Sequence, residues 1–162
     1  MSEGPKVLIV DDDKTWQMVI SAALHDDYKV VTAFDGDIGL KLAAEWVPDT
    51  ILLDIEMPGK NGYEICTALK ATPLLRDIPV IFLSGKSSLQ EKIAGFQLGA
   101  DDYIVKPCEA EYLKAKVARS TALYCEKKAA NAKAADAEIM AFEAMNSSCV
   151  FLPTVNTHYC LP

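Results

Sequence analysis

Five polar residues follow short apolar stretches of the sequence, and their types suit phosphoryl transfer. Asp11 and Asp12 come after KVLIV, Asp54 after TILL, Ser84 after PVIFL and Lys106 after YIV. A carboxylate such as that of Asp54 can act as a nucleophile and form an aspartyl phosphate. Lysine brings a compact positive charge, and serine a hydroxyl donor, to the oxygens of a phosphoryl group. The set predicts that Asp54 accepts a phosphoryl group.

The carboxylates also predict a metal site. Asp11, Asp12 and Asp54 would repel one another if they converged in a small space, and this would raise at least one pKa. A divalent cation relieves the repulsion, and oxygen ligands with retained waters suit Mg²⁺. Each residue read alone has an ordinary explanation, because an Asp after a strand is most often a helix cap. Their joint placement at four predicted strand ends favours the site.

The elements that position these residues alternate along the chain. Apolar, β-branched stretches predict strands, and apolar residues at helical spacing predict helices between them. The predicted strands are Lys6–Val10, Tyr28–Ala33, Thr50–Leu53, Pro79–Leu83 and Tyr103–Val105. This alternation indicates an α/β fold with a parallel sheet and right-handed crossovers. Such sheets bind ligands outside the carboxyl ends of their strands, where the five polar residues fall.

Several residues mark the predicted helices. Asp13 and Asp35 are expected to cap the helices that follow them, and Asn61 and Gly62 open another. Three apolar residues are expected to line the fourth helix, which Gly99 ends. They are Leu89, Ile93 and Phe96.

The chain changes character after Glu109. No Gly or Pro occurs from there to Leu152, and residues 129–145 are rich in alanine, so we expect one long helix to about Met145. Five alanines at 4-3 spacing could form a coiled-coil seam, although alanine buries little area. They are Ala130, Ala134, Ala137, Ala141 and Ala144. Residues 146–162 show no periodicity and receive no assignment.

Composition bounds the function. The 162 residues suit about one domain with an extension, and the formal net charge of -7 argues against non-specific nucleic-acid binding. No apolar run is long enough for a membrane span, and the first residues lack the pattern of a signal peptide. A cytoplasmic location is therefore expected. The five cysteines show no zinc-ligand spacing, and neither His25 nor His158 is given a role.

The chain from about Lys6 to Leu123 resembles the receiver domain of the two-component response regulators. The matching stretches are VLIVDDD, ILLDIEMPGKNGYEIC, PVIFLSG and GADDYIVKP, and the separations of Asp54 from Ser84 and Lys106 also fit. The resemblance implies a flavodoxin-like, doubly wound, five-stranded parallel sheet in the order 2-1-3-4-5, with helices on both faces. We therefore expect a receiver domain at 1–122, a helical extension at 123–145 and an unassigned tail at 146–162.

The resemblance also assigns roles to the acidic residues. Asp11 and Asp12 correspond to the pair that holds Mg²⁺, and Asp54 to the phosphorylated aspartate. The backbone carbonyl of Glu56 is expected to be a further metal ligand.

Roles for the remaining site residues follow from the same resemblance. Ser84 corresponds to the hydroxyl residue that bonds the phosphoryl group and moves with it. Lys106 corresponds to the family's invariant lysine, whose bond to Pro107 is commonly cis. Tyr103 corresponds to the aromatic residue that turns inward on activation.

The function implied is a phosphorylation-controlled switch that catalyses only its own phosphorylation and dephosphorylation. The phosphoryl group would come from a sensor histidine kinase or a histidine phosphotransfer protein. The face of the last two helices and the fifth strand would then bind a partner or form a homodimer, which the C-terminal helix could also support. We expect no direct nucleic-acid binding and no membrane association.

Three other possibilities remain. A hydrolase of the haloacid dehalogenase kind needs Asp-x-Asp at its nucleophile, but residue 56 is Glu. A pseudo-receiver would bind partners without phosphorylation, which the complete acidic set argues against. The chain could also be the N-terminal part of a longer regulator. Within the switch, we hypothesise that Glu56 and Lys86 face each other across the site and tune the access of water.

Overall fold

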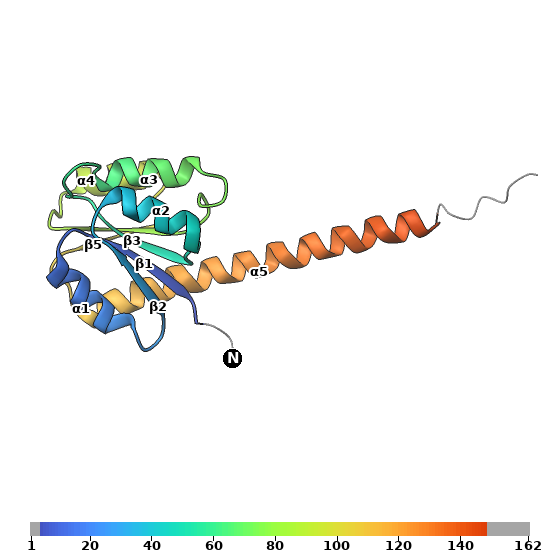
Figure 1. Ribbon diagram of the computed structural model, residues 1–162, viewed down its shortest axis with the longest axis horizontal. Coiled ribbons are helices and arrows are strands. Elements are labelled where there is room, and N and C mark those ends of the chain that lie inside the picture. Colours follow the sequence, from blue (N-terminus) through green and yellow to red (C-terminus); the bar gives the residue numbers. More distant parts are fainter. Residues whose placement is uncertain (1–3, 149–162) are drawn as a thin grey trace, which may run out of the picture. The chain divides into compact units, whose positions relative to one another are not determined.

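The computed structural model describes residues 4–148, in which strands and helices alternate as the sequence predicts (Figure 1). The strands are β1 (Lys6–Val10), β2 (Lys29–Ala33), β3 (Thr50–Asp54), β4 (Val80–Ser84) and β5 (Asp102–Val105). The helices are α1 (Lys14–Leu24), α2 (Gly36–Trp46), α3 (Gly62–Ala71), α4 (Leu89–Gln97) and α5 (Ala110–Ser148). The predicted strands differ from these bounds by one residue at most at either end.

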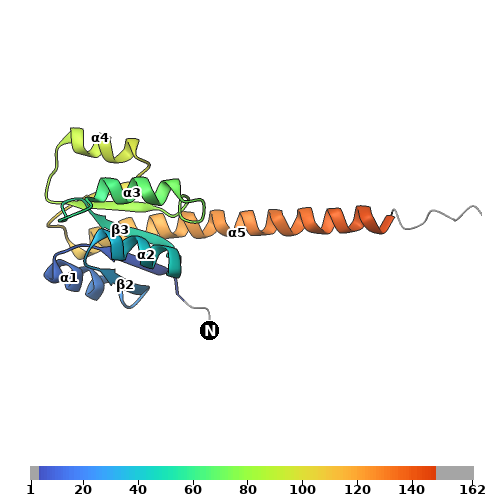
Figure 2. The same ribbon diagram turned by 45° about the horizontal axis from the view of Figure 1, so that its top comes forward.

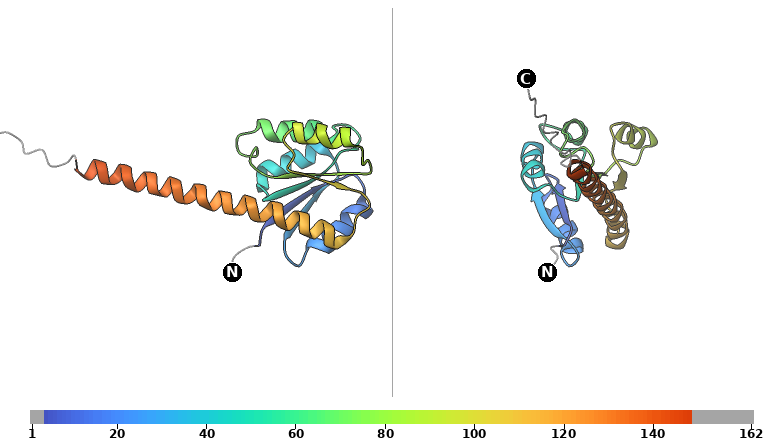
Figure 3. Two further views of the ribbon diagram at one scale, coloured as in Figure 1. Left: turned by 180° about the vertical axis from the view of Figure 1, so that it is seen from behind. Right: turned by 90° about the vertical axis from the view of Figure 1, so that its right-hand side faces the viewer.

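The strands form one parallel sheet in the order β2-β1-β3-β4-β5, which confirms the predicted topology. Helices α2, α3 and α4 cover one face, and α1 and the start of α5 cover the other (Figures 1, 2 and 3). The central strands β3 and β4 are buried along their whole length. Because apolar side chains must cover both faces, these strands are continuous apolar runs rather than alternating ones.

The two faces of the sheet have separate cores, and β1 shows how one strand supplies both. Leu8 and Val10 pack with residues of α2 and α3 on one face, and Val7 and Ile9 pack with residues of α1 and α5 on the other. Successive side chains of a strand point to opposite faces, which explains the division. The sheet edge that carries the polar residues is thereby fixed from both sides.

Side-chain caps begin the first three helices. Asp13 accepts hydrogen bonds from the backbone of Thr15 and Trp16, and Asp35 accepts one from Ile38, so both predicted caps are confirmed. Asn61 accepts a hydrogen bond from the backbone N–H of Glu64 at 3.0 Å. The Glu64 carboxylate accepts one in return from the backbone of Asn61 at 2.9 Å, which completes a capping box.

Replacing Asn61 with alanine should lower the free energy of unfolding by about 1 kcal/mol, because the N–H of Glu64 loses its acceptor. Urea unfolding of the Asn61→Ala variant measures this change. Asn131→Ala is a matched control, since Asn131 is an exposed residue inside α5 and caps no helix. Equal losses in both variants would show that the cap contributes nothing.

The apolar residues that line α4 are largely exposed. Leu89, Ile93 and Phe96 are 72%, 46% and 48% exposed. The contact with the sheet is made instead through Gly95, the buried residue of this helix. A Cβ on Gly95 would lie 2.9 Å from the Phe82 ring, so the missing side chain lets the helix backbone approach the sheet closely. The large apolar side chains consequently lie on the outside.

Helix α5 ends at Ser148, three residues beyond the predicted end, and the chain divides within it, after Cys125, into two units. In the first unit Leu113, Val117 and Tyr124 pack on the cores. In the second unit the described side chains, Glu126 to Asn146, are all exposed. Pairing through the alanine seam stays a prediction. The unassigned tail lies outside the described residues from residue 149 onward.

Among the described residues, no helix combines the length and the apolar character that a membrane span requires.

Candidate functional site

The parallel register brings the predicted site residues to one edge of the sheet. Asp54 and Ser84 are the last residues of β3 and β4, and Asp54 pairs with Leu83 across the ladder. Lys106 follows β5 directly, and its backbone N–H donates to the carbonyl of Ser84 at 2.7 Å. The Lys106–Pro107 peptide bond is cis, as the resemblance led us to expect. Polar residues from separate strands therefore meet at the carboxyl ends.

Three carboxylates gather at this edge. One oxygen from each of Asp11, Asp12 and Asp54 lies within 4.8 Å of the others. Asp11 and Asp54 are buried, whereas Asp12 is exposed. The cluster is open to solvent on the Asp12 side and closed by protein on the other. A cation bound here would contact oxygen ligands only.

Lys106 supplies the positive charge inside the cluster. Its ammonium lies 2.5 Å from Asp11 Oδ2 and 3.2 Å from Asp54 Oδ1. Its side chain is 18% exposed, so these ion pairs are shielded from water on most sides. The lysine therefore bridges two buried carboxylates that would otherwise repel each other.

The pKa of Asp54 is raised from 3.8 to about 7. Burial is the main cause, because it disfavours the ionised form, and the charges of Asp11 and Asp12 add to it. Lys106 acts in the opposite direction and does not cancel the rise. The protein alone thus leaves part of the negative charge at this edge uncompensated, which is the electrostatic condition that favours a bound cation.

Two residues that sequence reasoning did not assign to the site hold its backbone in place. The buried carboxamide of Gln17 donates to the carbonyl of Asp11 at 2.6 Å and to that of Ala33 at 2.7 Å. It ties the ends of β1 and β2 together beneath the cluster. A signal was available, since Gln17 lies on the buried stripe of α1 with Ile20 and Leu24.

The second residue is Gly62, which begins α3. A Cβ at this position would lie 2.4 Å from the carbonyl oxygen of Asp54 and 2.8 Å from Cα of Ile55. Its N–H donates to the Ile55 carbonyl at 3.0 Å. Glycine is therefore required because α3 begins directly against the backbone of the central aspartate. The sequence shows only a glycine at a helix start, and nothing in it reveals this contact.

The side chains of Ser84 and Tyr103 are both hydrogen-bonded to the backbone of Lys86, a residue of the β4–α4 loop. The backbone N–H of Lys86 donates to Ser84 Oγ at 3.0 Å, and the Tyr103 hydroxyl donates to the Lys86 carbonyl at 2.9 Å. Both side chains are buried, and burial raises the pKa of the Tyr103 hydroxyl. The tyrosine thus occupies the inward position, and one residue connects it with the serine.

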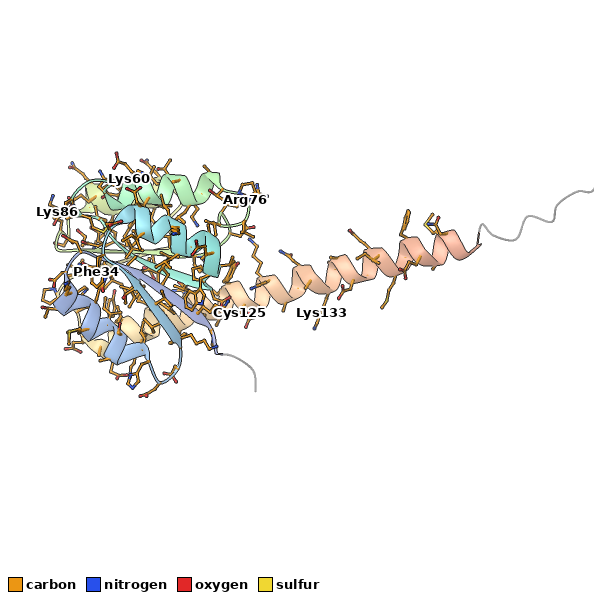
Figure 4. All side chains as sticks on the ribbon, in the orientation of Figure 1. Phe34, Lys60, Arg76, Lys86, Cys125 and Lys133 are labelled. Carbon is orange, nitrogen blue, oxygen red and sulfur yellow. The ribbon has the colours of Figure 1, made fainter. Side chains whose placement is uncertain are left out.

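The Lys86 side chain bridges two glutamates above the site. Its ammonium lies 2.8 Å from Glu56 Oε1 and 3.6 Å from Glu91 Oε1. Figure 4 shows Lys86 at the same end of the sheet as Phe34, which follows β2. Glu56 and Lys86 are paired as hypothesised, and both are more than half exposed, so the pair contributes little to stability. Its effect on water at Asp54 stays a prediction.

Residues 7–118 match the response regulator receiver domain. This chain belongs to the response regulator receiver family. It is 43% identical over 115 residues to the transcriptional regulatory protein PrrA of Mycobacterium tuberculosis. The aligned region covers 70% of this chain and 48% of PrrA. It is 40% identical over 114 residues to the DNA-binding dual master transcriptional regulator RpaA of Synechocystis. This aligned region covers 70% of the chain and 47% of RpaA.

Solved structures give the same assignment. The receiver is similar to the chemotaxis protein CheY4 of Vibrio cholerae, with a TM-score of 0.70 and 32% identity, over 72% of this chain and 98% of CheY4. A chemotaxis receiver is matched over nearly its whole length, whereas this chain spans about half the length of PrrA and RpaA. The similarity therefore concerns the receiver and leaves the remaining parts of those regulators unmatched.

Proposed function

We propose that Asp54 accepts a phosphoryl group from a histidine of a sensor kinase or of a histidine phosphotransfer protein. The observation that carries this proposal is the position of Lys106, which contacts both Asp11 and Asp54 inside a three-carboxylate cluster. The lysine is close enough to Asp54 to bind the oxygens of a phosphoryl group attached there. Membership of the receiver family supports the same function.

Asp11, Asp12 and Asp54 would hold Mg²⁺, with the backbone carbonyl of Glu56 as a further ligand. The residues fit this ion, because three carboxylate oxygens converge and burial leaves the charge of Asp54 poorly compensated. When bound, the metal supplies positive charge that offsets the negative charge of the incoming phosphoryl oxygens. The exposed side of the cluster at Asp12 leaves room for water ligands.

The protein's own residues perform the transfer. A carboxylate oxygen of Asp54 attacks the phosphorus of the phosphohistidine and forms the P–O bond. The P–N bond breaks, and the histidine nitrogen keeps its electron pair and takes a proton from solvent. Lys106 binds one phosphoryl oxygen, and the Ser84 hydroxyl donates to another.

The new group would change the loop that connects Ser84 with Tyr103. If the Ser84 hydroxyl turns to the phosphoryl group, its hydrogen bond with the Lys86 N–H is lost. Tyr103 is anchored to the same residue through the Lys86 carbonyl, so the loop transmits the change to α4 and β5. We propose that the face of α4, β5 and α5 controls a partner or dimerisation in this way, a local charge event that biases a two-state element.

Acetyl phosphate with Mg²⁺ tests the proposal. The parent protein should gain the mass of one phosphoryl group, labile to hydroxylamine, and peptide mapping should place it on Asp54. Asp54→Asn should gain none. Asp26→Asn is a matched control, because the Asp26 carboxylate is 80% exposed and pairs only with His25 among the described contacts.

Each other outcome supports a different function. A chain that gains no phosphoryl group and no beryllofluoride adduct would be a pseudo-receiver, which contradicts the proposal. Turnover of many molecules of a phosphorylated metabolite would indicate a hydrolase. PrrA and RpaA are named as transcriptional regulators and are about twice as long as the matched part, so any DNA-binding output would lie outside it. The absence of nucleic-acid binding and the cytoplasmic location stay predictions for this chain.

A further inference from the structure

We propose that Trp16 is a positioning residue for Lys106, whose ammonium is held beside Asp54 by the face of the Trp16 indole ring. The proposal rests on the function proposed above, in which Lys106 binds an oxygen of the phosphoryl group. It assigns a part in phosphoryl transfer to a residue of α1, an element that otherwise contributes only the support of Gln17 to the site.

The geometry places the ring against the lysine. Trp16 lies in the first turn of α1, where its backbone N–H donates to the Asp13 cap at 3.2 Å. Lys106 Nζ lies 5.8 Å from the centroid of the Trp16 ring. A cation within about 6 Å of a ring face is attracted to it, and Trp is the strongest of the aromatic partners. The capped helix start fixes the ring, and the ring limits where the ammonium can lie.

The ring performs a task that the carboxylates cannot. Asp11 is the closer anionic partner of Lys106, at 2.5 Å against 3.2 Å for Asp54, so it draws the lysine away from the acceptor. Sharing Asp11 with a metal would weaken that contact. The attraction of the ammonium to the ring does not depend on the metal. The ring also accepts no conventional hydrogen bond from the ammonium. The ring therefore uses none of the ammonium N–H groups of Lys106, one of which donates to Asp11, and leaves the others for Asp54 and the phosphoryl oxygens.

The indole is a poor choice for packing alone. Among the described residues, Trp16 Nε1 is the one buried side-chain nitrogen or oxygen that lacks a hydrogen-bond partner. A buried N–H without an acceptor destabilises the fold. The ring packs against the apolar cluster of Val7, Ile9 and Ile20, where a Leu or Phe would pack without a polar atom. The presence of an unpartnered N–H is explained if tryptophan is required for the contact of its ring face with Lys106 rather than for its volume.

The first test compares Trp16→Phe and Trp16→Leu in the reaction with acetyl phosphate and Mg²⁺. The rate of adduct formation at Asp54 should fall about threefold in the Phe variant and about tenfold in the Leu variant, since Phe retains a weaker ring face. Thermal midpoints should stay within about 5 °C of the parent, because the lost packing is offset by removal of the unpartnered N–H.

Trp46→Phe is the matched control. Its ring also lies under a lysine, with Lys6 Nζ at 5.4 Å from the centroid, but Lys6 begins β1 at the opposite end of the sheet. Its adduct rate should equal that of the parent. Equal rates in the parent and both Trp16 variants would overturn the proposal. If the Leu variant does not fold, the Phe variant decides the matter by the same criterion.

A second readout requires no phosphodonor. The chain has two tryptophans, so Trp46→Phe leaves Trp16 as the only source of indole fluorescence. Adding Lys106→Met should shift this emission, because the cation leaves the ring face. An unchanged spectrum would show that Lys106 does not contact the Trp16 ring and would overturn the proposal. If the spectrum shifts but the parent forms no adduct, the proposed function fails, and the positioning role fails with it.

Discussion

Replacing Asp54 with asparagine should make the Mg²⁺-free protein more stable at pH 7.5, although the side chain is buried. Burial raises the pKa of Asp54 from 3.8 to about 7. Above pH 7 the folded protein must hold an ionised carboxylate in a site that disfavours it, whereas an unfolded chain ionises it freely. The shift corresponds to about 4 kcal/mol at most, and we expect the asparagine variant to gain about 1–3 kcal/mol.

The sign of the pH dependence follows from proton binding. Between about pH 4 and pH 7 the folded state keeps a proton on Asp54 that the unfolded state has released, so the stability of the parent falls as the pH rises through this range. Below about pH 4 both states are protonated, and this contribution vanishes. The stability difference between Asp54→Asn and the parent should therefore grow from pH 4 to pH 7 and then level off.

Urea unfolding at several pH values measures the difference. Added Mg²⁺ should stabilise the parent more than the asparagine variant, because the cation offsets the charge that asparagine lacks. The exposed Asp26→Asn change should follow the parent at every pH. An asparagine variant less stable than the parent at pH 7.5 would show that the carboxylate is well compensated by Lys106 alone. That result would also weaken the case for a metal.

Gly62→Ala should destabilise the fold by about 1–3 kcal/mol, because the added methyl group would meet backbone rather than a movable side chain. The carbonyl of Asp54 would lie 2.4 Å from the new Cβ. That segment cannot withdraw easily, since the N–H of Ile55 is bonded to the Leu83 carbonyl at 3.1 Å. Alanine stabilises a helix more than glycine does. At the first residue of α3, however, this gain is too small to offset the steric clash.

Gly85→Ala is the matched control for this change. Gly85 lies on the same edge of the sheet, and a Cβ there would meet nothing within 4 Å. Its stability should match the parent within about 0.5 kcal/mol, as for other substitutions that disturb no packing. Where the Gly62→Ala protein folds, its rate of phosphorylation should also fall, because Asp54 is displaced from Lys106. Equal stability of the two variants would mean that α3 can shift without cost.

The sequence allows the sheet and the central site to be predicted because four of the five apolar runs end at a polar residue. Asp54, Ser84 and Lys106 could be placed together without a structure, since the carboxyl ends of parallel strands share an edge. For α4 the same reasoning identified apolar residues such as Leu89 and Ile93 but did not show that they are exposed. Periodicity shows that a helix has an apolar face and does not show whether a smaller residue, here Gly95, makes the closer contact with the sheet.

The roles of Gly62 and Trp16 were beyond prediction for a related reason. The approach of Gly62 to Asp54 and the position of the Trp16 ring at Lys106 depend on distances between separate elements of the fold. Spacing in the sequence records which residues share a strand end or a helix face. It does not record how closely two elements approach, which is where the tightest constraints of this site lie.

The connection through Lys86 depends on the backbone of this residue and not on its side chain. Tyr103 and Ser84 are bonded to the backbone carbonyl and N–H of this residue, and these groups are present whichever amino acid other than proline occupies the position. The side chain, which reaches Glu56 and Glu91, is therefore free to mutate without breaking the path from serine to tyrosine. Homologous receivers could thus diversify the charges around the acceptor while inheriting the same internal linkage.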